Sequence, residues 1–308
     1  MFNQFPNLKT GEPLSKHCWY ALGGPADYFI EVTDIDEIPK LISEAKENSI
    51  PYIIIGGGSN TVFHDEGLRG LVIKITADSL EFESGACRVV ADAGVSMMRL
   101  VKESMERELT GLESLFGLPG TVGGAIFGNA EAHGTAIGGF LESATLLDNN
   151  GNLKEVDKDY FQFSYRHSKL HSTGETILKV TLKLNQITEE DLENEELQVL
   201  RNKAEEALNF RKDHQPTGRN NGSFFKNPKG DYAGRLIDVA GLKGAKIGGA
   251  YISEKHGNFF MNDGTATTSD LIELRNLAKS TVKEKFDITL EEEVRIVMPN
   301  GTYLNDEN

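Results

Sequence analysis

The chain has 308 residues and a formal net charge of −15, and 39% of its residues are hydrophobic and 26% charged. This length exceeds one compact core and predicts two or three domains in a globular protein. The acidic balance excludes a nucleic-acid-binding protein, because phosphate backbones are bound by basic surfaces. No apolar run approaches the roughly 20 residues of a membrane helix. We therefore expect neither nucleic acid nor membrane among its partners.

The first residues and the two cysteines indicate a cytoplasmic protein. Residues 1–17 lack the apolar core of a secretory signal. Cys18 and Cys87 are too few for a disulfide framework, which fits a reducing compartment. No cluster of His, Cys and Asp residues has the spacing of metal ligands, so we predict no metal site.

The first region of the chain predicts a strand–helix–strand unit and one further strand. Its β-prone and apolar runs are interrupted by a segment whose apolar residues fall at helical spacing. The expected elements are strands over 27–32, 50–55 and 71–75 and a helix over 38–45. A turn-rich stretch, 78–85, follows them, and we place a boundary near residue 77.

The second region predicts mostly strands around a glycine-rich passage. Its expected elements are a strand over 87–93, a helix over 97–108, a hairpin over 142–156 and a strand over 178–184. The passage 111–139 has little strand pattern and is expected to be a long loop, which is usually functional. An acidic helix that carries much of the negative charge is expected from residue 189, until Pro216 and Gly218 break it.

The third region predicts a mixture of helices and strands. Its expected elements are helices over 232–240 and 269–285 and strands over 250–253, 258–262 and 288–298. In the last strand, Glu291, Glu293 and Arg295 would share one face, because alternate side chains of a strand point to the same side. A solvated edge strand is the simplest interpretation of that run.

The segment 222–228 places a hydroxyl, an ammonium and an amide within five residues, on Ser223, Lys226 and Asn227. A glycine before them lets a ligand approach the backbone closely, and a proline after them restricts the chain. The segment therefore suits a reactive anion site. Taken alone, it is equally consistent with an ordinary strand edge and a capping serine.

Two glycine-rich loops are typical of sites that bind phosphate. The residues of interest are Gly56, Gly57, Gly58, Ser59 and Asn60 in the first loop and Pro119, Gly120, Thr121, Gly123 and Gly124 in the second. Glycines let successive backbone amides converge on oxygen atoms, although each loop could also be a plain tight turn. No Walker sequence and no Rossmann G-x-G-x-x-G fits either loop. Two such loops favour a two-phosphate ligand, and FAD is a better candidate than NAD.

Two further polar segments could bind a ligand. Tyr165 and Arg166 place a phenol beside a fixed cation that suits a carboxylate, although a surface salt bridge is the simpler interpretation. Lys255 and His256 follow a predicted strand, where they could contact a ligand or only shape a loop. Neither segment identifies a ligand by itself.

In this order, the motifs resemble those of the UDP-N-acetylenolpyruvoylglucosamine reductases, flavoenzymes that complete UDP-N-acetylmuramate for peptidoglycan synthesis and so serve cell-wall formation and cell division. The resemblance covers nearly the whole chain, and 222–228 is its most diagnostic segment. It implies an α+β protein with a bipartite FAD-binding domain of the vanillyl-alcohol-oxidase type and a C-terminal α+β substrate-binding domain. The expected ranges are 1–76 and 77–208 for the two FAD-binding subdomains and 209–308 for the domain that binds the UDP-sugar.

The same resemblance implies roles for the candidate residues. Ser223 would donate a proton to the substrate, with Arg166 and Glu293 as the other catalytic residues. The two glycine loops would hold FAD without a covalent bond, and NADPH would supply the hydride. The residues expected to bind the substrate are Tyr165, Lys226, Asn227, Lys255 and His256. We expect a monomer of the shorter of the family's two forms, since no long insertion separates Arg166 from Gly222.

One position departs from the family pattern and two other functions remain open. Glu131 stands where the family usually has glycine, and it would strain the chain if that position required positive φ. The first alternative is an FAD-linked sugar or alcohol oxidase of the same fold, with His64 as the histidine linked to the flavin. The second is a non-catalytic paralogue that binds FAD or the UDP-sugar.

Overall fold

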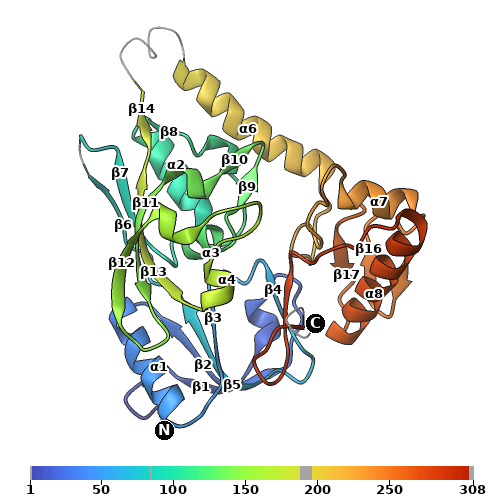
Figure 1. The fold of residues 1–308 in the computed structure, drawn as a ribbon, viewed down its shortest axis with the longest axis horizontal. Coiled ribbons are helices and arrows are strands. Elements are labelled where there is room, and N and C mark those ends of the chain that lie inside the picture. Colours follow the sequence, from blue (N-terminus) through green and yellow to red (C-terminus); the bar gives the residue numbers. More distant parts are fainter. Residues whose placement is uncertain (1, 84, 188–195, 305–308) are drawn as a thin grey trace.

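The computed structural model describes residues 2–83, 85–187 and 196–304, and Figure 1 shows them in three parts. Two sheets form the first two parts, and the long helix α6 (Glu196–His214) runs from them to the third part at the right of the view. None of the described helices is long and apolar enough to cross a membrane.

The first sheet has the strand order β1-β2-β5-β3. Its strands are β1 (Lys9–Pro13), β2 (Pro25–Val32), β3 (Tyr52–Ile55) and β5 (Leu68–Ile75). Strand β1 is antiparallel to β2, and the other pairs are parallel. Helix α1 (Ile38–Glu47) buries Ile38, Leu41, Ile42 and Ala45, whose spacing in the sequence predicted it. The predicted helix and three strands are confirmed, whereas β1 was missed because its exposed residues do not alternate.

The second sheet is antiparallel, with the order β12-β11-β13-β7-β6. Its strands are β6 (Leu80–Glu83), β7 (Arg88–Asp92), β11 (Leu141–Leu147), β12 (Leu153–Asp157) and β13 (Thr176–Lys183). The helices α2 (Met97–Glu106), α3 (Val122–Phe127) and α4 (Leu170–Thr173) accompany it. Short pairs join β8 (Leu109–Thr110) to β14 (Asn185–Gln186) and β9 (Glu131–Ala132) to β10 (Thr135–Ala136). The predicted hairpin and alternating strand are therefore confirmed.

A single apolar core joins these two sheets. Ile30 and Ile73 of the first sheet belong to the same buried cluster as Val89, Leu146 and Val180 of the second. Because apolar burial is the main stabilising term in a fold, the two sheets are held as one body.

The third part surrounds a separate core and is closed by the end of the chain. It contains α7 (Ala233–Val239), α8 (Thr268–Phe286), β15 (Lys246–Ile247), β16 (Ala250–Ile252) and β17 (Phe260–Asn262). Its buried cluster also takes in Tyr20 and Val62 from the beginning of the chain. Strand β18 (Arg295–Val297) pairs in parallel with β4 (Thr61–Phe63), so residues more than 230 positions apart lie side by side.

Three sequence predictions require correction. The passage 111–139 is not one long loop, because it contains α3, which the glycines of its sequence concealed. The strand expected over 288–298 is reduced to β18, and Glu292 is not on a solvated edge: its side chain is 6% exposed and forms ion pairs with Arg275 (2.5 Å) and Lys279 (2.6 Å) of α8. Glu131 lies in β9 and is not among the residues with positive φ, so the expected strain does not arise.

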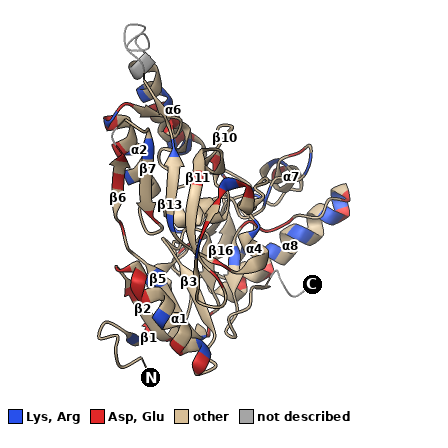
Figure 2. Ribbon diagram, turned by 60° about the vertical axis from the view of Figure 1, so that its left-hand side comes forward, with Lys and Arg blue, Asp and Glu red and all other residues tan. Residues whose placement is uncertain are grey.

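The charge of α6 also differs from the expectation. The described helix carries as many Lys and Arg residues as Asp and Glu residues, so it is not a net source of negative charge. The acidic run was predicted over 189–206, and its first part, 189–195, lies outside the described residues. Elsewhere, helices such as α8 also carry both acidic and basic side chains (Figure 2).

Candidate active site

The two glycine loops lie against each other, between the first and second sheets. A Cβ atom on Gly57 would lie 3.1 Å from the Cα atom of Gly120, and one on Gly56 would overlap Oγ1 of Thr121. The hydroxyl of Ser59 donates to the carbonyl oxygen of Pro119 at 3.5 Å. Only glycine permits this approach of two backbones, so the loops that the sequence singled out form one structure.

The second loop leads directly into α3. Thr121 is the N-cap of this helix, and its side chain accepts a hydrogen bond from the backbone N–H of Gly124 at 3.4 Å. Gly120 has φ of +103°, and a Cβ on Gly123 would lie 2.7 Å from that of Ala93. These glycines therefore let the loop turn tightly and pack against the end of β7, which leaves its backbone beside the first loop.

Substitution of Gly58 by alanine is expected to displace the first loop and to weaken FAD binding. Its φ is +66°, and an added Cβ would overlap the backbone oxygen of His17, so the backbone must move. The left-handed conformation alone costs a non-glycine residue about 1–2 kcal/mol. Gly151 also has positive φ but no atom within 4 Å, so Gly151→Ala is a control for that cost alone. Flavin absorbance per polypeptide measures the effect, and equal flavin content in both variants would contradict it.

A cleft of about 290 Å³ opens beside the paired loops. Its floor includes Gly56, Gly57 and Thr121, and its walls carry two cations, Lys74 and Arg99. Backbone amides, hydroxyls and fixed cations are the groups that bind a diphosphate. The residues present therefore fit FAD, whose diphosphate needs such a floor.

The segment 222–228 is anchored by two buried phenylalanines. Phe224 and Phe225 are fully buried, and the ring of Phe224 stacks on Phe260 at 4.4 Å. The side chain of Asn258 accepts from the N–H of Phe225 at 2.9 Å and donates to its carbonyl at 2.7 Å. Ser223 begins this anchored segment, and its hydroxyl has no hydrogen-bond partner in the part of the chain that the structure describes. The hydroxyl is thus positioned by its neighbours but left available.

Glu293 connects three of the predicted motifs. Its backbone N–H donates to the carbonyl of Phe224 at 2.9 Å, and its own carbonyl accepts from the side-chain amide of Asn60 at 2.9 Å. Its carboxylate Oε1 lies 3.2 Å from Nε of Arg166. The end of the first glycine loop, the segment that holds Ser223, and Arg166 therefore meet at one residue.

The electrostatics of this meeting point suit an anionic ligand. Burial raises the pKa of Glu293, although the charges of Arg166 and Lys226 act in the opposite direction. The Nε atom of Arg166 is buried and forms no hydrogen bond with the described residues, despite its closeness to Glu293. Arg166 also has φ of +53°, which a non-glycine residue rarely adopts. A guanidinium whose Nε lacks a hydrogen bond, on a residue held in an uncommon conformation, is ready to bind a carboxylate.

In the described part of the chain, the remaining candidate residues do not contact Glu293 as Arg166 does. Tyr165 is 45% exposed, next to Arg166, and Lys226 lies 3.9 Å from Glu291. The side chains of three others already form structural hydrogen bonds. Asn227 accepts from the N–H of Ala233, Lys255 donates to the carbonyl of Lys212, and His256 accepts from the N–H of Asn258. The described contacts join neither Lys255 nor His256 to Arg166 or Glu293.

Sequence reasoning missed an aromatic layer around His171, whose ring stacks at 4.9 Å on that of His167, the residue after Arg166. The rings of His171 and Phe127 lie 4.2 Å apart and are tilted by 34°, and the guanidinium of Arg295 lies 5.1 Å from the same Phe127 ring. Burial lowers the pKa of His171 to about 4, so its ring is neutral near pH 7. No spacing in the sequence relates Phe127, His171 and Arg295, because they come from three distant segments.

Comparison with known proteins identifies the class of enzyme to which this chain belongs and then its family. Residues 26–157 match the family described as FAD binding domain, which with the paired loops defines an FAD-binding enzyme. Residues 214–297 match the C-terminal domain of UDP-N-acetylenolpyruvoylglucosamine reductase. The chain belongs to the UDP-N-acetylenolpyruvoylglucosamine reductase family, as its relatives also indicate.

Two relatives and one solved structure with that name are similar to this chain over nearly their whole length. The reductase of Pelobacter propionicus is 40% identical over 293 residues, which cover 94% of this chain and 95% of the relative. Reductase 2 of Symbiobacterium thermophilum is 38% identical over 290 residues, covering 94% and 92%. The crystal structure of the reductase from Thermus caldophilus superposes with a TM-score of 0.78 at 31% identity, covering 92% of this chain and 97% of that one.

Proposed function

We propose that this protein reduces the enolpyruvyl group of UDP-N-acetylglucosamine enolpyruvate to give UDP-N-acetylmuramate, with non-covalently bound FAD and with NADPH as the hydride donor. The observation that carries the proposal is the position of Glu293, which joins Arg166, the segment of Ser223 and the first glycine loop. A reductase of this kind needs its carboxylate-binding groups and its proton donor beside the cofactor, and this residue brings them together.

The two glycine loops would hold the diphosphate of FAD through their backbone amides, with Ser59 and Thr121 as additional donors. When bound, reduced FAD supplies a hydride to the distal carbon of the enolpyruvyl double bond. This addition builds negative charge on the carbon next to the substrate carboxylate, and the protein must stabilise that charge and then protonate it. We propose that the first two regions of the chain hold the cofactor and that the third, from about residue 209, covers the substrate.

The residues around Glu293 can perform both tasks. Arg166 would bind the substrate carboxylate with its fixed charge, which is strongest in a site that excludes water. Burial favours the neutral form of Glu293, which can donate a hydrogen bond to the same carboxylate as charge develops on it. Ser223 would deliver the proton to the carbanion, and Lys226 would stabilise the alkoxide that remains. Tyr165, Asn227, Lys255 and His256 are proposed to position the rest of the UDP-sugar.

The two alternative functions fit these residues less well. In a histidine-linked oxidase His64 would be bonded to the flavin, but its Nδ1 accepts a hydrogen bond from the N–H of Glu66 at 3.2 Å, which leaves only Nε2 for such a bond. A binding protein would not need the group of Ser223, Arg166 and Glu293. The names of the relatives agree with the reductase and with neither alternative.

The function is tested with the purified protein. We expect a visible flavin spectrum, and we expect NADPH oxidation to accelerate only when UDP-N-acetylglucosamine enolpyruvate is added. Oxygen consumption in the presence of sugars or alcohols is the assay for the oxidase. A colourless protein, or NADPH oxidation that ignores the substrate, would overturn the proposal.

We also infer that the protein acts as a monomer in the cytoplasm. Both glycine loops and the group of Ser223, Arg166 and Glu293 come from one chain, so the site does not need a second subunit. NADPH and nucleotide sugars are available in that compartment. Light scattering of the FAD-bound protein measures its mass, and a stable dimer would contradict the first of these inferences.

A further inference from the structure

We propose that Asn129 is a positioning residue, which acts through Arg166 and fixes where the substrate carboxylate binds. Asn129 follows α3, the helix that begins in the second glycine loop, and its side chain holds the turn that presents Arg166. This inference rests on the proposed function, in which Arg166 binds that carboxylate. It gives a role in the reaction to a residue outside both glycine loops.

The backbone of Asn129 closes the end of α3, after the C-cap residue Gly128. Its N–H donates to the carbonyl of Ile126 at 3.1 Å. The N–H of Ala130 donates to the carbonyl of Ala125 at 2.8 Å. These two bonds form a Schellman motif, whose residue after the cap is left-handed and is usually glycine. Asn129 has φ of +45°, which asparagine tolerates. Glycine would suit this backbone at least as well, so the asparagine indicates a use of its side chain.

The side-chain amide of Asn129 joins two other segments of the chain. Its Nδ2 donates to the carbonyl of Ser164 at 2.9 Å, and its Oδ1 accepts from the N–H of Gly138 at 3.1 Å. Asn129 is only 7% exposed, so water cannot readily replace either bond. Loss of one partner would leave a buried polar group unsatisfied. The amide is therefore fixed at both ends.

The carbonyl of Ser164 also closes the turn that carries Arg166. It accepts from the N–H of His167 at 3.2 Å, and the N–H of Ser164 donates to the carbonyl of His167 at 3.1 Å. Tyr165 and Arg166 are thus the two corner residues. Arg166 has φ of +53°, a conformation for which turns usually use glycine or asparagine. Such a conformation persists only where surrounding contacts impose it, and Asn129 supplies one of them.

A second hydrogen bond ties the same turn to α3. Ser168 is fully buried, and its hydroxyl donates to the carbonyl of Phe127, the last residue of the helix, at 2.6 Å. Asn129 and Ser168 therefore attach the turn to the helix on both sides of Arg166. The helix has six residues, which corresponds to a length of about 9 Å. It acts as a short rigid spacer between the second glycine loop and Arg166.

The test replaces the donor of Asn129 and keeps its shape. Asn129→Asp tolerates the left-handed conformation and can still accept from Gly138, but it presents an oxygen to the carbonyl of Ser164. Reoxidation of the reduced flavin by the enolpyruvyl substrate should slow by about 10-fold to 100-fold, since a displacement of about 1 Å can have this effect. Flavin content and reduction by NADPH should change by less than about twofold. Asn129→Gly, which adopts the same φ without a charge, should give the same result.

A double variant separates positioning from a general effect on folding. Because Asn129 acts through Arg166, Asn129→Asp should slow reoxidation no further in a protein that already carries Arg166→Gln. A merely structural role would make the two losses multiply.

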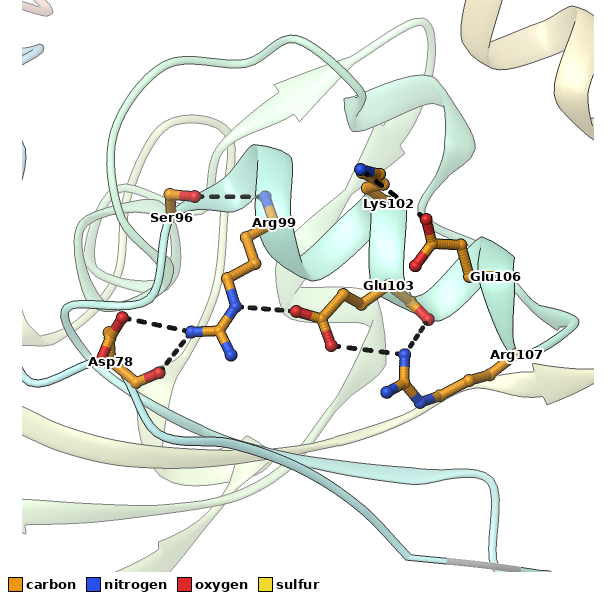
Figure 3. A network of polar contacts seen from close by, with 7 residues as sticks. All are labelled: Asp78, Ser96, Arg99, Lys102, Glu103, Glu106 and Arg107. Carbon is orange, nitrogen blue, oxygen red and sulfur yellow. Dashed lines mark hydrogen bonds and ion pairs between the residues drawn. The ribbon is translucent and has the colours of Figure 1, made fainter.

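Two control variants should keep the rates of the unmodified protein. Asn149→Asp removes a bond of the same kind, from Nδ2 to the carbonyl of Thr173 at 2.6 Å, in a turn that carries none of the candidate site residues. Arg107→Gln removes an arginine from the network of α2 that Figure 3 shows, where its Nη1 lies 3.3 Å from Oε2 of Glu103.

Hydrogen exchange tests the same hydrogen bonds without relying on catalysis. In Asn129→Asp and Asn129→Gly the amides of residues 164–168 should exchange about fivefold faster than in the unmodified protein, the factor for one lost hydrogen bond. The proposal is overturned if this exchange is unchanged, if Asn129→Asp slows both half-reactions alike, or if it slows reoxidation further in the Arg166→Gln background. An unmodified protein that ignores the enolpyruvyl substrate would instead contradict the proposed function, and the exchange rates would still decide whether Asn129 holds the turn.

Discussion

Replacing Ser223 by alanine is expected to slow the reduction of the enolpyruvyl substrate by about 10² to 10⁴-fold, the usual loss when a positioned acid is removed. The flavin should still be bleached by NADPH, because the hydroxyl of Ser223 acts only after the hydride has reached the substrate. Stopped-flow absorbance of the flavin separates the two half-reactions. Reduction by NADPH should keep its rate, while reoxidation by the substrate should become slow.

The same substitution at an exposed serine provides the control. Ser280 lies on α8, where its hydroxyl donates to the carbonyl of Leu277. Ser280→Ala should leave both half-reactions unchanged. Normal reoxidation in Ser223→Ala would remove Ser223 from the mechanism, and a loss of reduction by NADPH would show that it acts on the cofactor instead.

Removing the carboxyl of Glu293 is expected to have the second-largest effect. Glu293→Ala should slow reoxidation by about 10² to 10³-fold, the usual cost of one donor to a developing anion. Glu293→Gln should lose less, because its amide can still donate a hydrogen bond to the substrate carboxylate. Equal losses in the two variants would contradict the role of Glu293 as a hydrogen-bond donor to the substrate carboxylate. They would favour a role in which the carboxyl group transfers a proton or acts through its charge.

These variants should also change the pH dependence of stability. Burial raises the pKa of Glu293 above its ordinary value of 4.5, so the folded state holds the proton more tightly than the unfolded chain. Its contribution to stability is complete below pH 4.5 and is lost as the pH rises through the raised pKa. The unmodified protein should therefore lose stability over this interval relative to Glu293→Gln, which does not ionise.

Thermal unfolding of the apoproteins between pH 4 and pH 8 measures this difference. Glu291 supplies the control, because its side chain is in the same segment but is 76% exposed. The unfolding temperature of Glu291→Gln should follow that of the unmodified protein at each pH. A gap between Glu293→Gln and the unmodified protein that stays constant with pH would contradict the account.

The fold could be predicted where the pattern of apolar residues is regular. Helix α1 and strand β13 have clear periodicity and β2 and β5 are β-prone runs, and all four appear close to where the sequence predicted them. Helix α3 was missed because glycine lowers helix propensity, and here a threonine cap and packing against Ala93 outweigh it. The strand predicted over 288–298 is reduced to β18, and the alternation of its residues gave no sign that Glu292 forms ion pairs with Arg275 and Lys279 of α8.

The candidate site divides in a similar way. Local sequence indicated the glycine loops, Ser223 and Arg166, since each has a short motif with its own chemistry. The meeting of these motifs at Glu293 depends on backbone contacts between distant segments, such as that of Asn60 with Glu293. The cleft residues Lys74 and Arg99 could not be found, because they occupy ordinary positions on a strand and a helix. The sequence did not reveal which distant helices and strands contact each other in the folded protein.

The pairing of β4 with β18 affects when the site can fold during synthesis of the chain. Residues 61–63 can form their strand pairing only after residues 295–297 have been synthesised. The hydrogen bond from Asn60 likewise requires Glu293. Contacts of such sequence separation form late in folding, because a long loop must close first. During synthesis, the first glycine loop leaves the ribosome early but is completed only when nearly the whole chain has emerged. An unfinished chain therefore cannot assemble the active site, and a nascent fragment is not an active reductase.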